Sequence, residues 1–445
     1  MFGYTNEMHF RDMMSNSLQE RSKYISGITP GYIENLGLPS NSRTSDAGSS
    51  SIRSALVESN TLTPSVKPKP TAKEASTSKE ASTNIQHRYE APFNLFAMNW
   101  SLRKDENKRF RLAVASCRDP DQVGQPNHKS QAEMVQIVQL QQEKSSFDVL
   151  ADFQHSYSAN KIVWIPDIQG AYPDLLATSG DYLRVWKVKN GGGQGEKDTI
   201  EMAIILQNSH NAMSPDGKQS LPLTSFDWNQ ADPSILVTCS LDNSCTVWTL
   251  ETGQAIATNK SMSATVQTQL VAHDNHVYDV AFTHHSSGNR DMFASVGDEG
   301  SVRQFDLRNL VQSTVLYQEP HDRPLVRLAY AKQQTNCLAF FAENADQVIV
   351  LDIRMPNSPL AHLRGHSGNV NAMSWAAHSE NHLVSVGDDQ QVLIWDIQQV
   401  AARPTAGPIL SYTAAGPVNN VAWSELQPEW IAVVHDNSLE LLRVE

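Results

Sequence analysis

Hydrophobic residues recur along this chain in short runs that end in large apolar side chains. Seven runs end in an aromatic residue, and from the second repeat on a further run ends 19 to 23 residues later in Trp or an apolar substitute. The first series is Trp100, Trp164, Trp228, Phe282, Tyr330, Trp375 and Trp423, and the second is Val138, Trp186, Trp248, Phe305, Leu351, Trp395 and Leu442. The pairs recur every 44 to 64 residues. Repeats of this length with several short strands each predict an all-β protein, a seven-bladed β-propeller.

Each repeat contains three strand-like runs separated by turn residues. In the sixth repeat they are NVNAMSWAAHS, HLVSVGDDQ and QVLIWDI, and an Asp- or Gly-bearing hairpin follows the second run in most repeats. Insertions rich in Gly, Pro or Asn interrupt the pattern at 118–133, 189–199 and 207–221. We expect these insertions to be surface loops.

The seventh repeat lacks residues for a fourth strand, because Leu442 lies three residues before the last residue. An open sheet edge at this point would leave a row of unpaired backbone groups. The unassigned strand that remains is 84–91, which has the sequence NIQHRYEA. We therefore expect this strand to pair with 438–444 and to close the ring.

Residues 1–84 differ in composition from the propeller predicted over 85–445. From Ser40 this part is rich in Ser and Thr, and it repeats KEAST at 73–77 and 79–83. Such a segment buries too little apolar surface to offset the entropy lost on ordering. We expect a disordered Ser/Thr-rich extension, while its Met-, Phe- and Tyr-bearing start also suits a short partner-binding segment.

Charge and hydropathy narrow the class of protein. The net charge is −13, divided into +1 over residues 1–86 and −14 over the remainder. An acidic propeller repels phosphate backbones, so we expect no general binding to nucleic acid. The sequence has no run of about 18 apolar residues for a membrane span, and its first residues lack a basic region followed by an apolar one, so we expect neither a membrane span nor a secretory signal.

Histidines recur nine residues before the first-series aromatic, at His155, His273, His321 and His366. The sixth repeat has the fullest set, which consists of His366, Ser385, Asp388 or Asp389, and Trp395. Ser, His and Asp together are compatible with a hydrolase. They equally suit a buried relay in which Asp389 binds His366, His366 binds Ser385, and Ser385 binds the indole of Trp395. We favour the structural relay because the same positions recur around the ring, and we expect no catalytic residues.

Sites for metals or cofactors are not expected from the sequence. His284 and His285 lack a carboxylate or Cys at ligand spacing. The glycines at 191–193 are not followed by the Lys-Ser/Thr and helix that a phosphate loop requires.

Two consecutive repeats carry an Arg two residues after an Asp. They are Phe305-Asp306-Leu307-Arg308 and Leu351-Asp352-Ile353-Arg354. The Asp can help to end the strand, and the planar guanidinium suits carboxylates and carbonyls of a partner. Each Arg can instead form a bridge within its own or a neighbouring blade. Both interpretations remain open at this point.

Several phrases of the sequence are similar to one family. They are APFNLFAMNWS (91–101), YPDLLATSGDYLRVW (172–186), PLTSFDWNQADP (222–233), DMFASVGDEGSVRQFDLR (291–308), VLIWDIQQ (392–399) and NNVAWSELQPEWIAV (419–433). Over about 85–445 the chain resembles the Transparent Testa Glabra and anthocyanin-regulator family of WD-repeat adaptors, and especially its animal cullin-4-associated members. The insertions and the segment AFFAENADQ (339–347) depart from the family pattern.

The resemblance implies a non-enzymatic adaptor in cytoplasm and nucleus. Plant relatives bridge MYB and basic helix-loop-helix transcription factors, and animal relatives hold dual-specificity tyrosine-regulated and homeodomain-interacting kinases. Other roles that it allows are a substrate receptor of a cullin-4 ubiquitin ligase and a scaffold in cytoskeletal or small-GTPase signalling. In the ligase role, Phe305, Asp306, Arg308, Asp352 and Arg354 correspond to the family's boxes for the damaged-DNA-binding linker. The second box lacks its aromatic, and 395–398 has Gln where the box needs Arg.

Overall fold

The computed structural model describes residues 85–116, 133–191, 197–207, 221–251, 262–284, 291–334 and 336–444. The prediction of a disordered extension over 1–84 lies outside these residues. Most of the three predicted insertion loops also lies outside them, although β9 already begins at Thr199.

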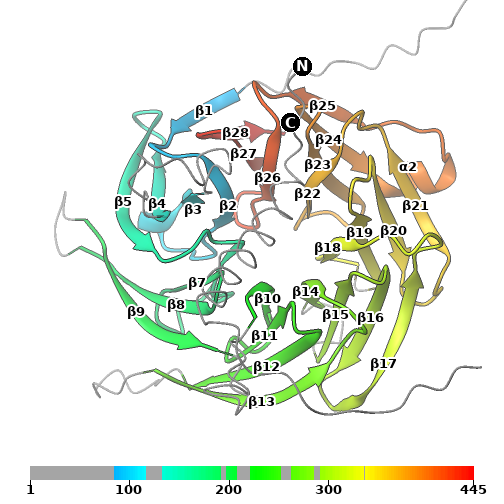
Figure 1. Cartoon of the computed structure of the whole chain (residues 1–445). Coiled ribbons are helices and arrows are strands. Elements are labelled where there is room, and N and C mark those ends of the chain that lie inside the picture. Colours follow the sequence, from blue (N-terminus) through cyan, green and yellow to red (C-terminus); the bar gives the residue numbers. More distant parts are fainter. Residues whose placement is uncertain are drawn as a thin grey trace, which may run out of the picture. The chain divides into compact units, whose positions relative to one another are not determined.

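The described residues form seven four-stranded antiparallel sheets, which are the seven blades predicted (Figure 1). Blades 1 and 2 are β2 (Leu95–Trp100), β3 (Arg111–Ser116), β4 (Glu133–Gln141), β5 (Ser146–His155), and β6 (Lys161–Trp164), β7 (Leu175–Ser179), β8 (Leu183–Lys189), β9 (Thr199–Leu206). Blades 3 and 4 are β10 (Leu223–Trp228), β11 (Ile235–Ser240), β12 (Ser244–Glu251), β13 (Ser263–Val271), and β14 (Val277–Phe282), β15 (Met292–Gly297), β16 (Ser301–Asp306), β17 (Asn309–Gln318). Blades 5 and 6 are β18 (Leu325–Tyr330), β19 (Cys337–Ala342), β20 (Gln347–Asp352), β21 (Pro359–Arg364), and β22 (Val370–Trp375), β23 (His382–Gly387), β24 (Gln391–Asp396), β25 (Leu410–Thr413). Blade 7 is β26 (Val418–Trp423), β27 (Trp430–His435), β28 (Ser438–Arg443) and β1 (Ile85–Glu90).

The first strand of every blade lies innermost, and these strands contact one another around the ring in the order β2, β6, β10, β14, β18, β22, β26 and back to β2. Each first-series aromatic is the last residue of its inner strand. Each second-series residue lies in the third strand of its blade. The aromatic period of the sequence therefore marks the same two positions in all seven blades.

Strand β1 closes the ring, as the sequence predicted. It pairs antiparallel with β28, from Ile85 opposite Leu442 to Glu90 opposite Ser438. The first strand of the described chain thus becomes the outer strand of the last blade. The chain after it adds two backbone bonds, from Ala91 N–H to Asn437 O and from Leu95 N–H to Asp436 O.

The apolar core lies between blades. Seven clusters of buried side chains each join two neighbouring blades, and the aromatics of the inner strands take part in them. Trp375, for example, is 2% exposed and donates its indole N–H to Ala329 O of the preceding blade at 3.0 Å. Burial of a large aromatic with its polar atom satisfied stabilises the contact between blades.

Among the described residues, two short helices interrupt the strands. The 3-10 helix η1 spans Glu106–Lys108, and α2 spans Ile397–Ala402 directly after β24. The strand-like pattern of the sequence did not indicate α2. None of the helices among the described residues has the length and apolar character needed to cross a bilayer.

Candidate functional site

The Ser-His-Asp set of blade 6 forms a buried hydrogen-bond chain. His366 Nδ1 lies 3.0 Å from Asp389 Oδ1, and His366 Nε2 lies 2.7 Å from Ser385 Oγ. Trp395 Nε1 donates to the same Ser385 Oγ at 2.8 Å. Asp388 instead accepts from Asn371 Nδ2, so Asp389 is the acid of the set.

Burial and charge fix the direction of this chain. Burial opposes ionisation of Asp389, but the interactions with His366 and with the backbone N–H groups of Ser367 and Gln391 together outweigh it and lower the pKa of the carboxyl group. An ionised Asp389 accepts the Nδ1 proton, which leaves Nε2 to accept from the Ser385 hydroxyl. Ser385 is 0% exposed, and its oxygen already accepts the indole proton. This geometry links two strands, a loop and a turn, and it keeps the serine away from any substrate in solution.

The same chain recurs in other blades with substitutions. Between blades 1 and 2, His155 Nε2 at the end of β5 and Trp186 Nε1 in β8 both lie 2.9 Å from Thr178 Oγ1. In blade 4, His273 Nε2 lies 2.6 Å from Ser295 Oγ, and its Nδ1 contacts Glu299. The fourth histidine of the series does not follow this pattern.

His321, which the sequence places in that series, is exposed at the molecular surface. Blade 5 has Phe340 where blade 6 has Ser385, and Leu351 where blade 6 has Trp395. The side chains of Phe340 and Leu351 have no hydrogen-bonding atoms, so they cannot continue the chain of hydrogen bonds. The spacing of nine residues between His321 and Tyr330 therefore wrongly predicted that His321 belongs to the buried series.

The two Asp-x-Arg turns have matching geometry. Arg308 donates Nε–H to Asp306 Oδ1 at 2.8 Å and Nη2–H to Oδ2 at 2.6 Å. Arg354 binds Asp352 in the same way, donating Nε–H to Oδ1 at 2.9 Å and Nη2–H to Oδ2 at 2.6 Å. Each Asp also accepts the backbone N–H of its Arg, so it ends the strand and holds the turn. The hydrogen bond from each Arg lowers the pKa of the paired carboxyl group.

These arginines remain exposed although each is paired within its own turn. The exposed fractions of the Arg308 and Arg354 side chains are 66% and 69%. Phe305 of the first box, in contrast, is 3% exposed and stacks on Phe293 with ring centroids 5.0 Å apart. We expected Phe305 to take part in docking, and the structure corrects this, since the ring supports the turn from inside the core.

Both turns lie on one side of the ring. The first and third strands of a blade run parallel, so both end at the same side of the ring, and each turn follows a third strand. The loop that follows Arg354 also contacts β17 of the preceding blade, because Asn357 N–H donates to Leu316 O and Asn357 Oδ1 accepts from Gln318 N–H. Met355, next to Arg354, is 60% exposed. We call the surface formed by Arg308, Arg354 and Met355 the arginine surface.

Blade 6 uses the corresponding Asp differently. Asp396 caps α2 by accepting the backbone N–H groups of Gln398 and Gln399. The chain therefore continues as a helix where the other two blades place an exposed Arg. This explains in structural terms why 395–398 departs from the box.

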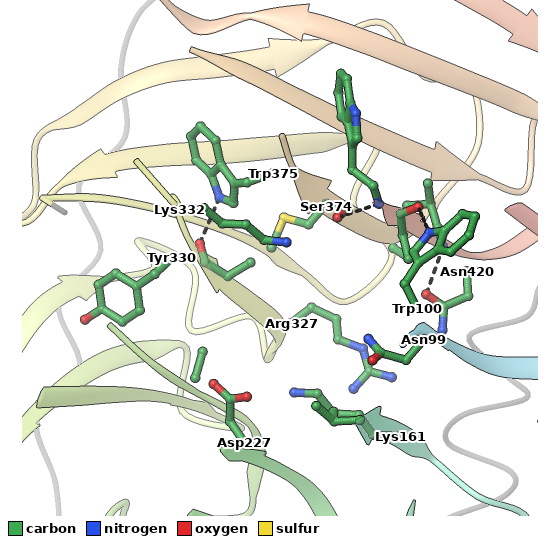
Figure 2. A pocket seen from close by; sticks show the side chains of 18 of the residues that line it. Asn99, Trp100, Lys161, Asp227, Arg327, Tyr330, Lys332, Ser374, Trp375 and Asn420 are labelled. Atoms are coloured by element: carbon green, nitrogen blue, oxygen red, sulfur yellow. Dashed lines mark hydrogen bonds between the residues drawn. The ribbon is translucent and has the colours of Figure 1, made fainter. Parts of the chain in front are cut away.

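A second site is the channel at the centre of the ring, a cavity of about 260 Å³ (Figure 2). All seven inner strands line it, and their charged side chains lie at defined depths along the channel. Three residues before the closing aromatic lie Lys161, Asp279 and Arg327. Lys161 Nζ lies 3.2 Å from Asp279 Oδ1, and Figure 2 shows Arg327 and Lys161 extending into the open centre.

Near the other end of the channel lies a second charged group. Lys332 Nζ and Glu425 Oε1 form an ion pair at 2.6 Å across blades 5 and 7. Burial, with the nearby Lys332, lowers the pKa of His284 to about 4, and burial raises the pKa of Asp227 to about 6. Asp227 accepts the backbone N–H of Phe282 in the next blade at 2.7 Å. Many of the polar groups of the channel therefore join blades to one another.

In the described part of the chain, no group of three or more His, Cys, Asp or Glu side chains is arranged to hold an ion. His284 lies within that part and His285 outside it.

The charged side chains that line the channel were not predicted from the sequence. The signal was the fixed offset of Lys161, Asp279 and Arg327 from the aromatics at Trp164, Phe282 and Tyr330. Equal offsets in different repeats place side chains at one depth of a ring. Which of them meet still depends on the order of blades in space.

Comparisons with known proteins agree with this architecture. The family model "WD domain, G-beta repeat" matches residues 264–306 and 357–396, which cover parts of blades 3, 4, 5 and 6.

Longer similarities extend over most of the ring. The chain is 40% identical over 358 residues to the DDB1- and CUL4-associated factor 7 homolog of Dictyostelium discoideum, covering 80% of this chain and 98% of that protein. It is 32% identical over 420 residues to an uncharacterized WD repeat-containing protein of Schizosaccharomyces pombe, covering 80% of this chain and 89% of that protein. A WD repeat-containing protein of Saccharomyces cerevisiae is 32% identical over 333 residues, covering 69% of this chain and 57% of that protein.

Proposed function

Because the chain belongs to the family of WD-repeat proteins that includes the DDB1- and CUL4-associated factor 7 homolog, we propose that it is a non-enzymatic adaptor that holds other proteins together. A rigid ring presents fixed turns on two faces, so that several partners can bind at once. The buried state of Ser385 supports an adaptor over a hydrolase.

The most specific form of this proposal is a substrate receptor of a cullin-4 ubiquitin ligase. The observation that carries it is the arginine surface, where Arg308 and Arg354 lie in matching turns of consecutive blades and remain 66% and 69% exposed. Each guanidinium is held by its own Asp, so little side-chain entropy is lost when a partner binds. The neighbouring Met355 supplies a flexible apolar contact.

The relative's printed name supports the same partner, since it associates that protein with DDB1 and CUL4. The docking residues that we propose are Asp306, Arg308, Asp352 and Arg354. Phe305 acts indirectly, by holding the first turn in place.

Co-purification with the cullin-4 linker tests this proposal. The double variant Arg308→Ala, Arg354→Ala should lose most of the linker, because exposed Arg residues near the centre of an interface often contribute about 2 kcal/mol or more each. Arg364→Ala is the matched control, since Arg364 is exposed in the same blade and binds Gln347 Oε1 at the opposite end of β20. Undiminished linker in the double variant would refute docking through these turns.

The finer partner set follows the resemblance to the Transparent Testa Glabra and anthocyanin-regulator adaptors. On that basis we propose that the ring bridges dual-specificity tyrosine-regulated or homeodomain-interacting kinases, or transcription factors, to other proteins in cytoplasm and nucleus. A cytoskeletal or small-GTPase signalling scaffold is the alternative. Affinity purification with mass spectrometry, with and without residues 1–84, separates these partner classes, and recovery of neither kinases nor transcription factors would refute the bridging role.

A further inference from the structure

The loop that follows β8 begins with an asparagine and a glycine, Asn190-Gly191. The last pair between β8 and β9 is Lys189 opposite Thr199, so Asn190 and Gly191 lie beyond the paired strands. Asn190 is exposed, and its side chain forms no hydrogen bond with other residues that the structure describes. The Asn190 amide is therefore open to reaction.

A carboxylate contacts the backbone nitrogen next to this amide. Gly191 N–H donates to Asp198 Oδ1 at 3.0 Å. Asp198 is itself held by the neighbouring blade, because its N–H donates to Leu150 O of β5 at 2.8 Å. It also directly precedes β9, which begins at Thr199. A hydrogen-bond acceptor on a fixed main chain thus lies against the nitrogen that follows Asn190.

We propose that Asn190 is a site of self-catalysed deamidation, with Asp198 as the base. The Gly191 nitrogen bonds to Cγ of Asn190 while its proton passes to the Asp198 carboxylate. The Cγ–Nδ2 bond then breaks, and the leaving nitrogen takes the proton back from Asp198 and departs as ammonia. Water opens the resulting five-membered succinimide at one of its two carbonyls, which leaves aspartate or isoaspartate at position 190.

Each of the three residues supplies one requirement of this reaction. Asn190 provides the electrophilic amide carbon. Gly191 has no Cβ, so its nitrogen can approach that carbon without a steric clash. The attack is intramolecular, and it needs only the removal of one proton by a group within hydrogen-bond distance. Asp198 is that group.

Deamidation changes the charge of one side of the ring. β8 is the third strand of blade 2, and third strands end on the side that carries the arginine surface. The reaction places a new carboxylate there, close to Asp198, and the isoaspartate product also adds a methylene group to the main chain between β8 and β9. The inference goes beyond the proposed ligase role, because it concerns another blade and requires no partner.

The test uses the full chain, incubated at neutral pH and digested with trypsin at intervals. The tryptic peptide 190–197, NGGGQGEK, contains Asn190 as its single asparagine. Mass spectrometry measures the exchange of its amide nitrogen for oxygen, and an isoaspartyl methyltransferase with a labelled methyl donor measures the isoaspartate. Asn309 is the internal control, since it is exposed but followed by Leu310, and its peptide should stay unchanged.

Asp198→Asn should slow the conversion of Asn190 about tenfold, because it removes the base while Gly191 remains. Asp152→Asn is the matched control, since Asp152 is 41% exposed, accepts from Lys197 Nζ at 2.7 Å and has no bond to Gly191. This control should convert at the rate of the unaltered chain. Gly191→Ala should also slow the reaction, since a side chain at 191 hinders the attack.

The unaltered chain unfolded in guanidinium chloride gives the same comparison without any substitution. It keeps Asn190-Gly191 but loses the contact with Asp198, so it should convert about tenfold more slowly than the folded chain. Equal or faster conversion in the unfolded chain or in Asp198→Asn would overturn the proposal, because the hydrogen bond would then only restrain the nitrogen. Equal slowing in Asp152→Asn and Asp198→Asn, an unchanged rate in Gly191→Ala, or no conversion of Asn190 in the folded chain would also overturn it.

Discussion

Glu440 is a fully buried carboxylate at the seam of the ring, and its replacement by glutamine tests how the seam is held. The residue lies in β28, between β1 and β27, and is 0% exposed. Tyr412 Oη donates to its Oε2 at 3.0 Å, His435 Nε2 lies 3.2 Å from Oε1, and Arg88 Nη1 lies 4.0 Å away. Side chains from three other strands, β25, β27 and β1, thus meet at one carboxylate of β28.

The magnitude follows from these contacts. Glu440→Gln keeps the shape and the oxygen that accepts from Tyr412, but it loses the charge that faces His435. Hydrogen bonds to charged groups contribute about 1.5–3 kcal/mol, and a half-exposed Arg88 at 4.0 Å adds little. We expect a loss of about 2 kcal/mol, which raises the opening constant of the seam about 30-fold.

The pH dependence of seam opening gives an independent measure of the contact between Glu440 and His435. Contact with Glu440, against burial, raises the pKa of His435 above its ordinary value of 6.5. This stabilisation is fully present below 6.5 and is lost as pH rises through the folded-state pKa. The pKa of Glu440 is lowered, since His435 and Tyr412 outweigh burial, so its own contribution is lost as pH falls below its ordinary value of 4.5.

Hydrogen exchange with mass spectrometry on β1 and β28 is the assay. In the unaltered chain the seam should open more readily at about pH 8 than at about pH 6, and Glu440→Gln should flatten this difference. Glu90→Gln is the matched control, because Glu90 is 68% exposed in β1 and lies 3.6 Å from Arg88. Equal exchange in the two variants, or an unchanged pH dependence in Glu440→Gln, would show that the buried carboxylate does not hold the seam.

Two further perturbations test the ring itself. Ser385→Ala leaves His366 and the indole of Trp395 without their shared partner, so the free energy of unfolding should fall by about 1–3 kcal/mol in urea titration, and labelling with a serine-directed phosphonate should be absent from both proteins. An unchanged midpoint would refute the structural relay. Deletion of 84–92 should abolish cooperative unfolding because it removes β1, whereas deletion of 1–80 should leave the melting temperature unchanged; the reverse result would place ring closure elsewhere.

Much of the fold could be predicted because its repeat appears as a regular spacing of residues along the sequence. Trp100 and Trp423 end the same strand of different blades, and that equivalence is visible as a period. The closure by β1 followed from counting strands after Leu442. Local hydrogen-bond sets within a blade, such as His366 with Ser385, are also readable because their members recur at fixed offsets.

Contacts between blades could not be predicted in the same way. The pairing of Glu440 with Tyr412 and Arg88 joins residues 28 and 352 positions apart, and no offset in the sequence connects them. Exposure was the other difficulty. His321 and Phe305 matched their motifs, but one lies at the surface and the other in the core, since the neighbouring blade decides which side chains are covered.

The pairing of Ile85 with Leu442 also determines when the protein can become complete during its synthesis. Six blades use strands that follow one another closely along the chain, so the strands of each can pair once they have left the ribosome and pack when the next blade follows. The seventh must wait for β28, which is the last strand of the described chain to be synthesised, long after β1. Contacts between such distant residues form slowly, because a long loop must close first. For a nascent chain, loss of the first strand and premature termination before the last strand therefore leave the same unfinished blade.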